Sequence, residues 1–287
     1  MSLVLSNTPW EDYKVDGVTV HVKREDMCCP DPGPSFSKVR GLAAHLDYEC
    51  DKRRNPVVGV MDTLHSKAGW GAAYVCQQLG VRCIDFYPVL KSDNGQVRPN
   101  QLRAEALGAE IYPMQPLTKI IGGKPRLLQL KSAVLWARAR KMLEETYGPD
   151  AIMLPNALKL EEAYASNAVE AEKYTPDRLK CGSWVYSISS GTIAAGVIRG
   201  LRGLPIEHWL HMGYGRGIDP VWNYVVNKAG WEPKVHCKNE GYSYKDKVDN
   251  SWIPFPCNEY YDAKAFDWLV RNIIFLKQPI VFWNVGA

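Results

Sequence analysis

Long hydrophobic runs are missing from this chain of 287 residues. A membrane-spanning helix needs about eighteen or more consecutive apolar residues, and no such stretch occurs, so we expect no part of the chain to cross a bilayer. The beginning, MSLVLSNTPWEDYK, lacks the basic segment of a secretory signal and is interrupted by Ser6 and Asn7. We therefore expect a cytoplasmic protein.

Paired cysteines and a large net charge are also lacking. The eight cysteines include no CxxC pair and no zinc-ligand spacing, so we expect buried, reduced thiols. The formal net charge of +4 is only weak evidence for a polyanionic partner. No internal repeat and no low-complexity tract is present, which excludes repeat architectures.

Apolar content is ordinary, whereas aromatic residues are abundant. The chain is 46% hydrophobic and 23% charged, as in typical soluble globular proteins. It contains ten tryptophans and fifteen tyrosines. We interpret most of these rings as core and lid packing, with an aromatic platform for a ligand as the alternative.

Strand and helix patterns alternate along the chain. Expected strands cover 17–23, 56–61, 82–88, 151–154, 183–188, 207–212 and 279–284. Expected helices cover 38–53, 68–80, 126–147, 160–174, 192–201, 219–230 and 263–275, and 100–114 holds a helix, a glycine and a strand. Such alternation predicts βαβ units, mostly parallel sheets and an α/β fold. Because ligands bind at the carboxyl ends of strands in such sheets, we expect function in the loops that follow strands.

The segment SISSGTIAAG, 187–196, runs from an expected strand directly into a helix rich in small residues. Free N–H groups at a helix start form a cradle for a phosphate, and the hydroxyls of Ser189, Ser190 and Thr192 add donors. Neither GxxxxGK[ST] nor GxGxxG is present, so no nucleotide-binding motif is met. The alternative is a serine-capped helix that packs through its small residues.

A second loop of this kind lies in MDTLHSKAGWG, 61–71. Between the strand and a helix opened by glycines stand the polar residues Asp62, Thr63, His65, Ser66 and Lys67. The pattern suits an anion such as a substrate carboxylate, and a polar loop with a helix cap is the alternative. The same two interpretations hold for His65, as a substrate contact or as a cap.

Lys38 in PSFSKVRG, 34–41, stands in the first turn of an expected helix, where its charge faces the positive end of the helix dipole. A lysine in a cleft beside an anion site is a candidate nucleophile, because desolvation and neighbouring cations lower its pKa. A solvated surface lysine is the alternative. Together, a reactive lysine, a phosphate cradle and a carboxylate-binding loop are what a pyridoxal phosphate enzyme needs.

Segments along nearly the whole chain resemble, in order, the motifs of the fold type II pyridoxal-phosphate-dependent family, the tryptophan-synthase-β-like group. NTPW, VKREDM and PSFSKVRG resemble its TPL start, its KRED strand and its SFKxRG lysine motif. LHSKAGWGAA, QLRAEALGAEI and ISSGT resemble its TSGNxGxxxA substrate loop, its helix-Gly-Ala-Glu step and its GSGGT phosphate loop.

This resemblance implies two three-layer αβα domains with mostly parallel sheets and pyridoxal 5'-phosphate in the cleft between them. The larger, cofactor-binding domain would comprise 1–45 and 150–287, and a smaller mobile domain 46–149. Lys38 would hold the cofactor as an imine, which together with the phosphate relieves its charge. The remaining implied contacts are Ser189, Ser190, Gly191 and Thr192 for the phosphate, and Thr63, His65, Ser66 and Lys67 for the substrate.

The C-terminal third is similar to the aminocyclopropane-carboxylate deaminase and D-cysteine desulfhydrase branch. EGYSY, YYDAKAFDWL and IVFWNVGA resemble its GYG, VYxGKAM and VLFWHTGG segments. The resemblance makes Tyr242 and Tyr261 candidate acid/base tyrosines. Asp262 follows where the branch carries its partner for the ring nitrogen, and a carboxylate there would keep that nitrogen protonated. The alternative for Asp262 is a helix N-cap, and both roles can coexist.

The chain departs from the family pattern at three places. Lys67 replaces the asparagine that contacts the cofactor's phenolic oxygen, Ile188 and Ser190 replace two glycines of the phosphate loop, and Ser37 precedes the lysine where the deaminase branch has glycine-asparagine. These changes put the usual small amino-acid substrate in doubt, and the longer Lys67 favours a larger, anionic amine.

We consider three functions. The first is a lyase acting at Cα of an amino acid or amine-bearing relative, by elimination, deamination or α-decarboxylation, because a protonated ring favours a carbanionic intermediate. In the second, the amino acid is attached to a nucleic-acid base, as in phage-type DNA hypermodification. The third is a non-catalytic binding module that kept the fold. We expect a homodimer. We expect no metal site, because His208 and His211 lie on opposite faces of an expected strand.

Overall fold

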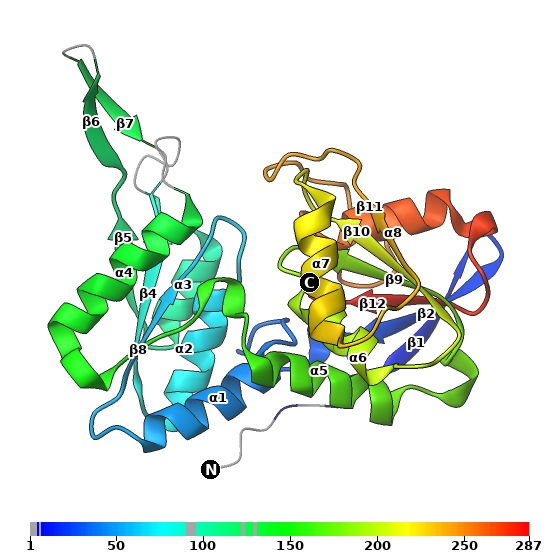
Figure 1. The fold of residues 1–287 in the computed structure, drawn as a ribbon, viewed down its shortest axis with the longest axis horizontal. Helices are drawn as coiled ribbons and strands as arrows, with labels where there is room; N and C mark the ends of the chain where they lie inside the picture. Colours follow the sequence, from blue (N-terminus) through cyan, green and yellow to red (C-terminus); the bar gives the residue numbers. More distant parts are fainter. Residues whose placement is uncertain (1–4, 6, 90–95, 122–123, 129–130, 287) are drawn as a thin grey trace. The chain divides into compact units, whose positions relative to one another are not determined.

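The computed structural model describes residue 5 and residues 7–89, 96–121, 124–128 and 131–286. The chain divides into two compact units (Figure 1). The larger unit runs to Asp31, includes Ser35–Gly41 and continues from Leu160, and the smaller unit includes Pro32–Pro34 and Leu42–Lys159. The domain boundaries expected at 45/46 and 149/150, and the mobility of the smaller domain, stay predictions.

A mostly parallel sheet forms the centre of the larger unit. Its strands are β1 (Trp10–Val15), β2 (Val18–Arg24), β9 (Gly182–Ile188), β10 (Ile206–Met212), β11 (Val235–Lys238) and β12 (Ile280–Asn284). Their order is β1-β2-β12-β9-β10-β11. The first two strands form an antiparallel hairpin, and the other pairings are parallel.

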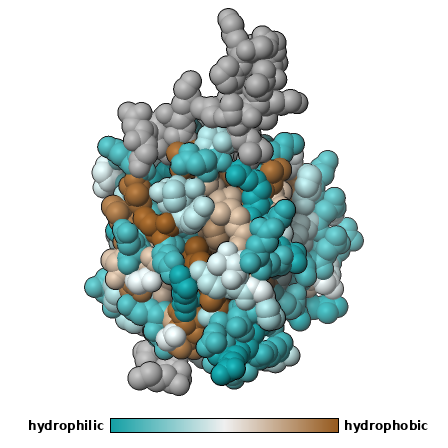
Figure 2. All heavy atoms as spheres, turned by 90° about the vertical axis from the view of Figure 1, so that its left-hand side faces the viewer, coloured by the Kyte–Doolittle hydropathy of each residue, from teal (hydrophilic) through white to brown (hydrophobic). Residues whose placement is uncertain are grey.

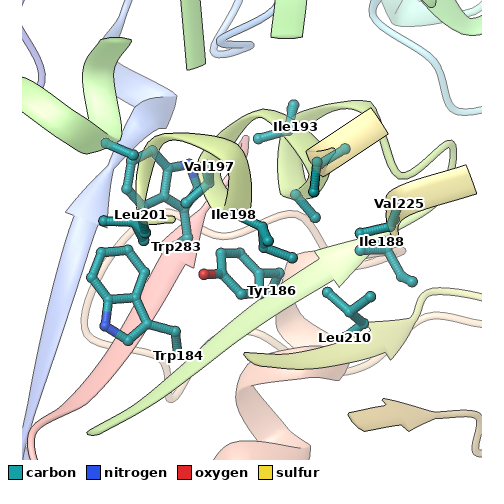
Figure 3. Close-up of a cluster of buried hydrophobic side chains, with 14 of the residues drawn as sticks. Trp184, Tyr186, Ile188, Ile193, Val197, Ile198, Leu201, Leu210, Val225 and Trp283 are labelled. Atoms are coloured by element: carbon teal, nitrogen blue, oxygen red, sulfur yellow. The ribbon is translucent and has the colours of Figure 1, made fainter. Parts of the chain in front are cut away.

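Both faces of this sheet are buried, so the side chains of each central strand alternate between two cores. On β9, Trp184, Tyr186 and Ile188 belong to a core formed with α5 (Glu161–Tyr174), α6 (Thr192–Gly200) and α7 (Ile218–Ala229). Val185 belongs to the core on the opposite face, formed with α8 (Asp262–Arg271). Figure 3 shows the side chains of α6 lying over those of β9 in the first core. Helices therefore cover the sheet on both faces, which gives three layers.

Helix α6 approaches α5 closely because two of its residues lack a side chain. A Cβ atom at Gly200 would lie 2.2 Å from the carbonyl oxygen of Ala168, and one at Gly196 would lie 2.7 Å from that of Tyr164. No side chain fits at such distances, so the helix pair requires glycine at both positions. This contact fixes α6, and with it the loop that precedes the helix.

The smaller unit has a parallel sheet of its own. Its strands are β3 (Val57–Met61), β4 (Arg82–Pro88), β5 (Glu110–Met114) and β8 (Ala151–Met153), in the order β5-β4-β3-β8. Helix α4 (Ser132–Tyr147) packs Leu135, Ala139 and Leu143 against one face of this sheet. A separate antiparallel hairpin is formed by β6 (Leu117–Ile121) and β7 (Lys124–Leu128).

Three further helices complete this part of the chain: α1 (Val39–Asp51), α2 (Ala68–Leu79) and α3 (Pro99–Ala106). Short 3-10 turns are η1 (Glu25–Met27), η3 (Gly148–Asp150), η4 (Asn156–Leu158), η5 (Asp177–Leu179) and η6 (Ile273–Phe275). Figure 2, which faces the side that lies to the left in Figure 1, shows hydrophilic residues in the majority and hydrophobic ones in small groups.

The expected α/β class with mostly parallel sheets is confirmed. The helix expected over 126–147 is wrong in its first part, because Lys124–Leu128 is a strand and the helix begins only at Ser132. Strands β1 and β11 were not expected from the sequence pattern. No helix among the described residues is long and apolar enough to cross a membrane.

Candidate active site

Three neighbouring parallel strands of the larger unit, β12, β9 and β10, end side by side at Asn284, Ile188 and Met212. The residue after β10, Gly213, donates its N–H to the carbonyl oxygen of Ile188 at 3.0 Å. The loops that follow these strands therefore meet at one edge of the sheet. This is the edge at which α/β sheets bind ligands.

The loop after β9 is a tight strand-to-helix turn. Gly191 has φ +83°, and a Cβ atom there would lie 3.0 Å from Val225 Cγ2 and 3.2 Å from Tyr224 Cδ1. Both the backbone conformation and the space select glycine. Helix α6 begins at the next residue; its N-cap, Gly191, offers no capping side chain, and the Ser190 hydroxyl accepts the N–H of Thr192 at 3.4 Å. The helix start thus presents its positive end to whatever the loop binds.

Hydroxyl groups line this turn and connect it to Lys38. The Oγ of Ser190 lies 3.0 Å from Thr192 Oγ1, and the side-chain amine of Lys38 donates to Ser190 Oγ at 3.0 Å. Lys38 is buried, immediately before α1. The structure therefore brings together Lys38, Ser190 and Thr192, which were expected to share a site although 152 positions separate the lysine from Ser190.

Buried ion pairs hold the start of α1 in place. Arg40 donates to Glu25 Oε2 at 2.5 Å, and Lys23 donates to Glu170 Oε1 at 2.5 Å. The guanidinium of Arg24 forms two hydrogen bonds to Asp26, at 2.9 and 2.8 Å. The KRED segment, noticed in the sequence only as a resemblance, thus anchors the helix that follows Lys38.

Tyr224 and Tyr164 belong to the same site and were not expected. The hydroxyl of Tyr224, on α7, lies 3.4 Å from Thr192 Oγ1 and forms a hydrogen bond with the hydroxyl of Tyr164 on α5. Burial and the neighbouring Tyr224 hydroxyl raise the pKa of Tyr164, so this hydroxyl stays protonated. Each tyrosine lies within an ordinary amphipathic helix pattern, and such a pattern does not indicate that the two hydroxyl groups are in contact.

Asp262 is the first residue of α8 and is fully buried. Its Oδ1 accepts a hydrogen bond from the N–H of Val285 at 3.1 Å. The next residue, Gly286, forms an isolated β-bridge with Phe36, two positions before Lys38. The segment after β12 therefore contacts both the chain before Lys38 and the carboxylate of Asp262.

Four tyrosines gather beyond the end of β10. The ring of Tyr261 lies against Gly213, where a Cβ atom would be 2.7 Å from Tyr261 Cδ1, and its hydroxyl donates to Tyr244 at 3.2 Å. The ring centroids of Tyr244 and Tyr214 are 5.0 Å apart in an edge-to-face arrangement. The carbonyl oxygen of Tyr242 accepts from the N–H of Gly215 at 2.6 Å. Tyr214 and Tyr244 were not expected at the site.

The candidate acid/base tyrosine Tyr242 is adjacent to a buried cation. The side-chain nitrogen of Lys264 lies 4.8 Å from the centre of the Tyr242 ring and donates to the carbonyl oxygen of Gly213 at 2.7 Å. Burial lowers the pKa of Lys264 and raises the pKa of Tyr242. Both shifts favour the neutral forms of these groups.

The second loop, in the smaller unit, is organised by a carboxylate from the chain itself. Asp62 is fully buried and accepts hydrogen bonds from the N–H of Thr63 at 3.0 Å and from the side chain of Gln101 at 2.8 Å. It also accepts from the Ser66 hydroxyl and from the N–H of Gly69. Burial outweighs these bonds and raises the pKa of Asp62 to about 6.

Asp85, on β4, lies behind this loop. Its carboxyl group is in contact with Gly69, where a Cβ atom would be 2.2 Å from Asp85 Oδ2. Neither oxygen has a hydrogen-bond partner among the described residues. Burial and the charge of Asp62 raise the pKa of Asp85 well above its usual range, which favours the neutral form of this carboxyl group.

The expected substrate-loop residues Thr63, His65, Ser66 and Lys67 are all half-buried and lie between β3 and α2. The Ser66 hydroxyl accepts the N–H of Ala68 at 3.0 Å. The side-chain nitrogen of Lys67 is 6.0 Å from the ring centre of Trp70. These residues lie in the smaller unit and Lys38 in the larger, so their joint contact with a substrate stays a prediction.

The two histidines of β10 have different hydrogen-bond partners. His208 Nδ1 lies 2.9 Å from the Tyr186 hydroxyl, and His211 Nε2 lies 3.0 Å from Glu240 Oε2. Burial lowers the pKa of His208 to about 3. A neutral, hydrogen-bonded core residue is consistent with the structural role expected for it.

No family model matches this chain. It is 43% identical over 295 residues to a glycyl-dTMP PLP-dependent decarboxylase of Pseudomonas phage M6, an alignment that covers 99% of this chain and 100% of that protein.

Among solved structures, the chain is similar to an ACC deaminase homologue, with a TM-score of 0.77 and 19% identity over 99% of this chain and 90% of that one. It is also similar to a fungal L-serine ammonia-lyase from Rhizomucor miehei, with a TM-score of 0.68 and 14% identity over 100% and 94% of the two chains. At these identities the structural likeness shows the fold alone.

Proposed function

This chain belongs to the fold type II family of pyridoxal-phosphate-dependent enzymes, and from that premise we propose that it is a decarboxylase whose substrate is a glycyl group carried by a thymidine nucleotide. The supporting observation is the 43% identity, along the full length of both chains, to a glycyl-dTMP PLP-dependent decarboxylase. The general class, a lyase that uses pyridoxal phosphate, agrees with the first function considered from the sequence. The nucleotide-linked substrate agrees with the second.

The residues at the edge of the larger sheet fit the cofactor. A phosphate dianion suits the positive start of α6, the hydroxyls of Ser190 and Thr192, and the turn at Gly191, whose positive φ and tight surroundings favour glycine. The buried amine of Lys38 lies 3.0 Å from Ser190 Oγ, within reach of a group held by that loop. We therefore assign Ser189–Thr192 to the phosphate and Lys38 to the covalent attachment.

Bound pyridoxal phosphate supplies an electron-withdrawing ring that accepts the electron pair left when a bond to Cα breaks. The side chains of this chain do the rest. Lys38 would hold the cofactor covalently, and its side-chain amine would supply the proton that Cα needs when CO₂ leaves. Asp262, a buried carboxylate, would keep the ring nitrogen protonated. Tyr242 and Tyr261 are assigned to proton transfer and substrate orientation.

The chemistry restricts how the glycyl group is joined to its nucleotide. Attachment to the cofactor needs a primary amine, and decarboxylation needs a free carboxylate. Glycine has only its nitrogen, its Cα and its carboxyl group as points of linkage, so the nucleotide is joined at Cα. Breaking the bond between Cα and the carboxyl carbon then gives CO₂ and a primary amine on the nucleotide.

We further propose that the protein acts in a reducing compartment, the cytoplasm, and as a homodimer. Each of the eight cysteines is free, which suits reducing conditions. Ile274 and Phe275 of η6 are 79% and 76% exposed, an apolar pair suited to a subunit contact. Light scattering of the wild type and of Phe275→Ser tests this. A monomeric wild type contradicts the dimer.

Turnover of a Cα-linked glycyl-dTMP tests the function. The holoenzyme should release one CO₂ per molecule and leave the nucleotide primary amine, as followed by mass spectrometry. Aminocyclopropane-carboxylate and D-cysteine serve as comparison substrates. Fast conversion of either, with no CO₂ from the nucleotide, contradicts the decarboxylase and leaves the ordinary lyase.

A further inference from the structure

The segment Gly213–Gly217, which follows β10, is fixed to the candidate site by its backbone. Gly213 donates to Ile188, the residue directly before Ser189, at 3.0 Å, and Gly215 donates to the carbonyl oxygen of Tyr242 at 2.6 Å. Arg216 lies within this segment, and its own carbonyl oxygen accepts from the side chain of Asn239 at 3.0 Å. Arg216 is thus held close to residues assigned to the cofactor and to proton transfer.

The guanidinium of Arg216 uses only part of its hydrogen-bonding capacity. Its Nη1 donates to the hydroxyl of Tyr214 at 3.3 Å, and its Cζ lies 5.2 Å from the centre of the Tyr214 ring. Its Nε and Nη2 are buried and have no hydrogen-bond partner among the described residues. Those two nitrogens form the fork with which arginine binds both oxygens of a phosphate or carboxylate.

Two acidic side chains of the segment around Tyr242, Glu240 and Asp246, are engaged with other residues. Glu240 accepts two hydrogen bonds from Arg271, at 2.8 and 2.9 Å, and contacts His211. Asp246 accepts the N–H of Ser243 at 2.6 Å and the Ser243 hydroxyl at 2.6 Å. Stacking on Tyr214 explains how the guanidinium packs, but it leaves two buried donors unsatisfied, which is unfavourable. An anion supplied by a ligand would satisfy both donors.

Aromatic rings surround the same position. Tyr214 and Tyr244 meet edge to face at 5.0 Å, and Tyr244 accepts the hydroxyl of Tyr261 at 3.2 Å. All three are half-buried, so their rings are available in part to a planar group. An arginine fork next to aromatic rings matches a nucleotide, which has an anionic phosphate and a planar base.

We propose that Arg216 binds the phosphate group of the nucleotide-linked substrate through Nε and Nη2, with Tyr214 and Tyr244 beside the base. This rests on the proposed function, and it names the residue that distinguishes a nucleotide from a free amino acid. Arg216 is a specificity-determining residue, because the phosphate it binds is remote from the bond that breaks. Removing it should therefore affect KM rather than kcat.

Binding of thymidine 5'-monophosphate and of thymidine, measured by calorimetry, tests the proposal without turnover. The wild type should bind the monophosphate at least about tenfold more tightly than the nucleoside, as expected for a charge-assisted bidentate contact. Arg216→Gln should lose this difference. Arg216→Lys should keep only part of it, since an ammonium cannot form the fork. Arg199→Gln, which removes an exposed arginine of α6, is the matched control and should bind like the wild type.

Turnover gives the second readout. With glycyl-dTMP, Arg216→Gln should raise KM about tenfold or more and leave kcat nearly unchanged, whereas with the phosphate-free nucleoside it should match the wild type. Circular dichroism and cofactor uptake establish that the variant is folded. A short oligothymidylate distinguishes a phosphodiester from a terminal phosphate, and Arg216-dependent binding of either supports the site.

The proposal and the proposed function fail in different ways. If the wild type turns over glycyl-dTMP but Arg216→Gln has the same KM, the phosphate site is overturned and the decarboxylase stands. If the wild type binds the monophosphate through Arg216 but releases no CO₂, the site stands and the decarboxylase fails. Equal affinity of the wild type for the monophosphate and for thymidine overturns the site.

Discussion

Each unit of this protein contains a strand that runs into a helix through a short polar loop, yet the two loops are built differently. In the larger unit the loop at Ser189–Thr192 is lined by hydroxyls and contacted by Lys38, and its own acceptor for a helix N–H is the neutral hydroxyl of Ser190. In the smaller unit Asp62 accepts the N–H groups of Thr63 and Gly69. The first loop carries neutral hydroxyls, whereas the second already contains an anionic group, the carboxylate of Asp62, supplied by its own chain.

From this difference we infer separate tasks for the two loops. The positive start of α6 is available for the cofactor phosphate. Near the start of α2, the carboxylate of Asp62 already accepts backbone N–H groups that could otherwise bind an anion. We therefore expect this loop to contact a substrate through the side chains of Thr63, His65, Ser66 and Lys67. Four predictions test this contrast, from the largest expected effect to the smallest.

Lys38→Ala should lower turnover by about three orders of magnitude or more, because it removes both the attachment of the cofactor and the amine that moves the proton at Cα. Steady-state CO₂ release measures the loss, and circular dichroism establishes the fold. Lys180→Ala, a lysine paired with Asp177 at the surface, is the control and should retain full activity. Substantial activity in Lys38→Ala would mean that another amine holds the cofactor.

Gly191→Asp should raise the dissociation constant for pyridoxal phosphate by about 100-fold, since it adds a like charge at the phosphate site and removes about 3 kcal/mol of binding. Cofactor titration followed by visible absorbance measures this. Gly203→Asp is the matched control, because Gly203 also has a positive φ, +78°, and has open space around it. Both variants should lose some stability, but only the first should lose cofactor affinity. Equal affinities would place the phosphate elsewhere.

Asp62 should make the stability of the smaller unit depend on pH. Its pKa is raised by burial to about 6 in the folded protein, against 3.8 for the unfolded chain, so the folded state binds more protons between these values. Stability should therefore fall as pH rises from about 4 to 6, by about 3 kcal/mol for this group.

Asp62→Asn should abolish that contribution, as urea unfolding across the pH range would show. Other carboxylates titrate in the same range, so the quantity to compare is the difference between wild type and variant. Asp47→Asn, an exposed residue on α1, is the control. A difference that does not change between pH 4 and 6 would mean that Asp62 does not titrate as described.

Tyr224→Phe should weaken cofactor binding only about two- to fivefold, because one neutral hydroxyl beside Thr192 contributes about 0.5–1 kcal/mol. The same titration measures it, with the exposed Tyr174→Phe as the control. A loss as large as that of Gly191→Asp would mean that Tyr224 contacts the phosphate directly.

Much of the fold followed from local patterns. The apolar run at 183–188 and the small-residue helix after it correspond to β9 and α6, because a strand buried on both faces and a helix packed through glycine leave strong signals. The helix expected from 126 was placed too early. Leu127 and Leu128 fit a helical period as well as a strand, and the hairpin register that decides between them involves residues on both sides of a turn.

Some residues of the candidate site could likewise be predicted from the sequence, and others could not. Lys38 and the loop at Ser189–Thr192 carry motifs, so they were expected together before any geometry was known. Tyr224 and Arg216 were not expected, because each reaches the site through helix and loop packing that a single sequence does not encode locally. Asp62 was noticed only as one polar residue among five, and its carboxylate gains its role from burial.

The most direct test of the contrast between the two loops is to find where the cofactor is attached. The wild type should be reconstituted with pyridoxal phosphate, reduced with borohydride, digested and mapped by mass spectrometry. The account predicts a visible absorbance band before reduction and a single labelled peptide containing Lys38. Label on Lys67 of the smaller unit, or a colourless and unlabelled protein in excess cofactor, would contradict it.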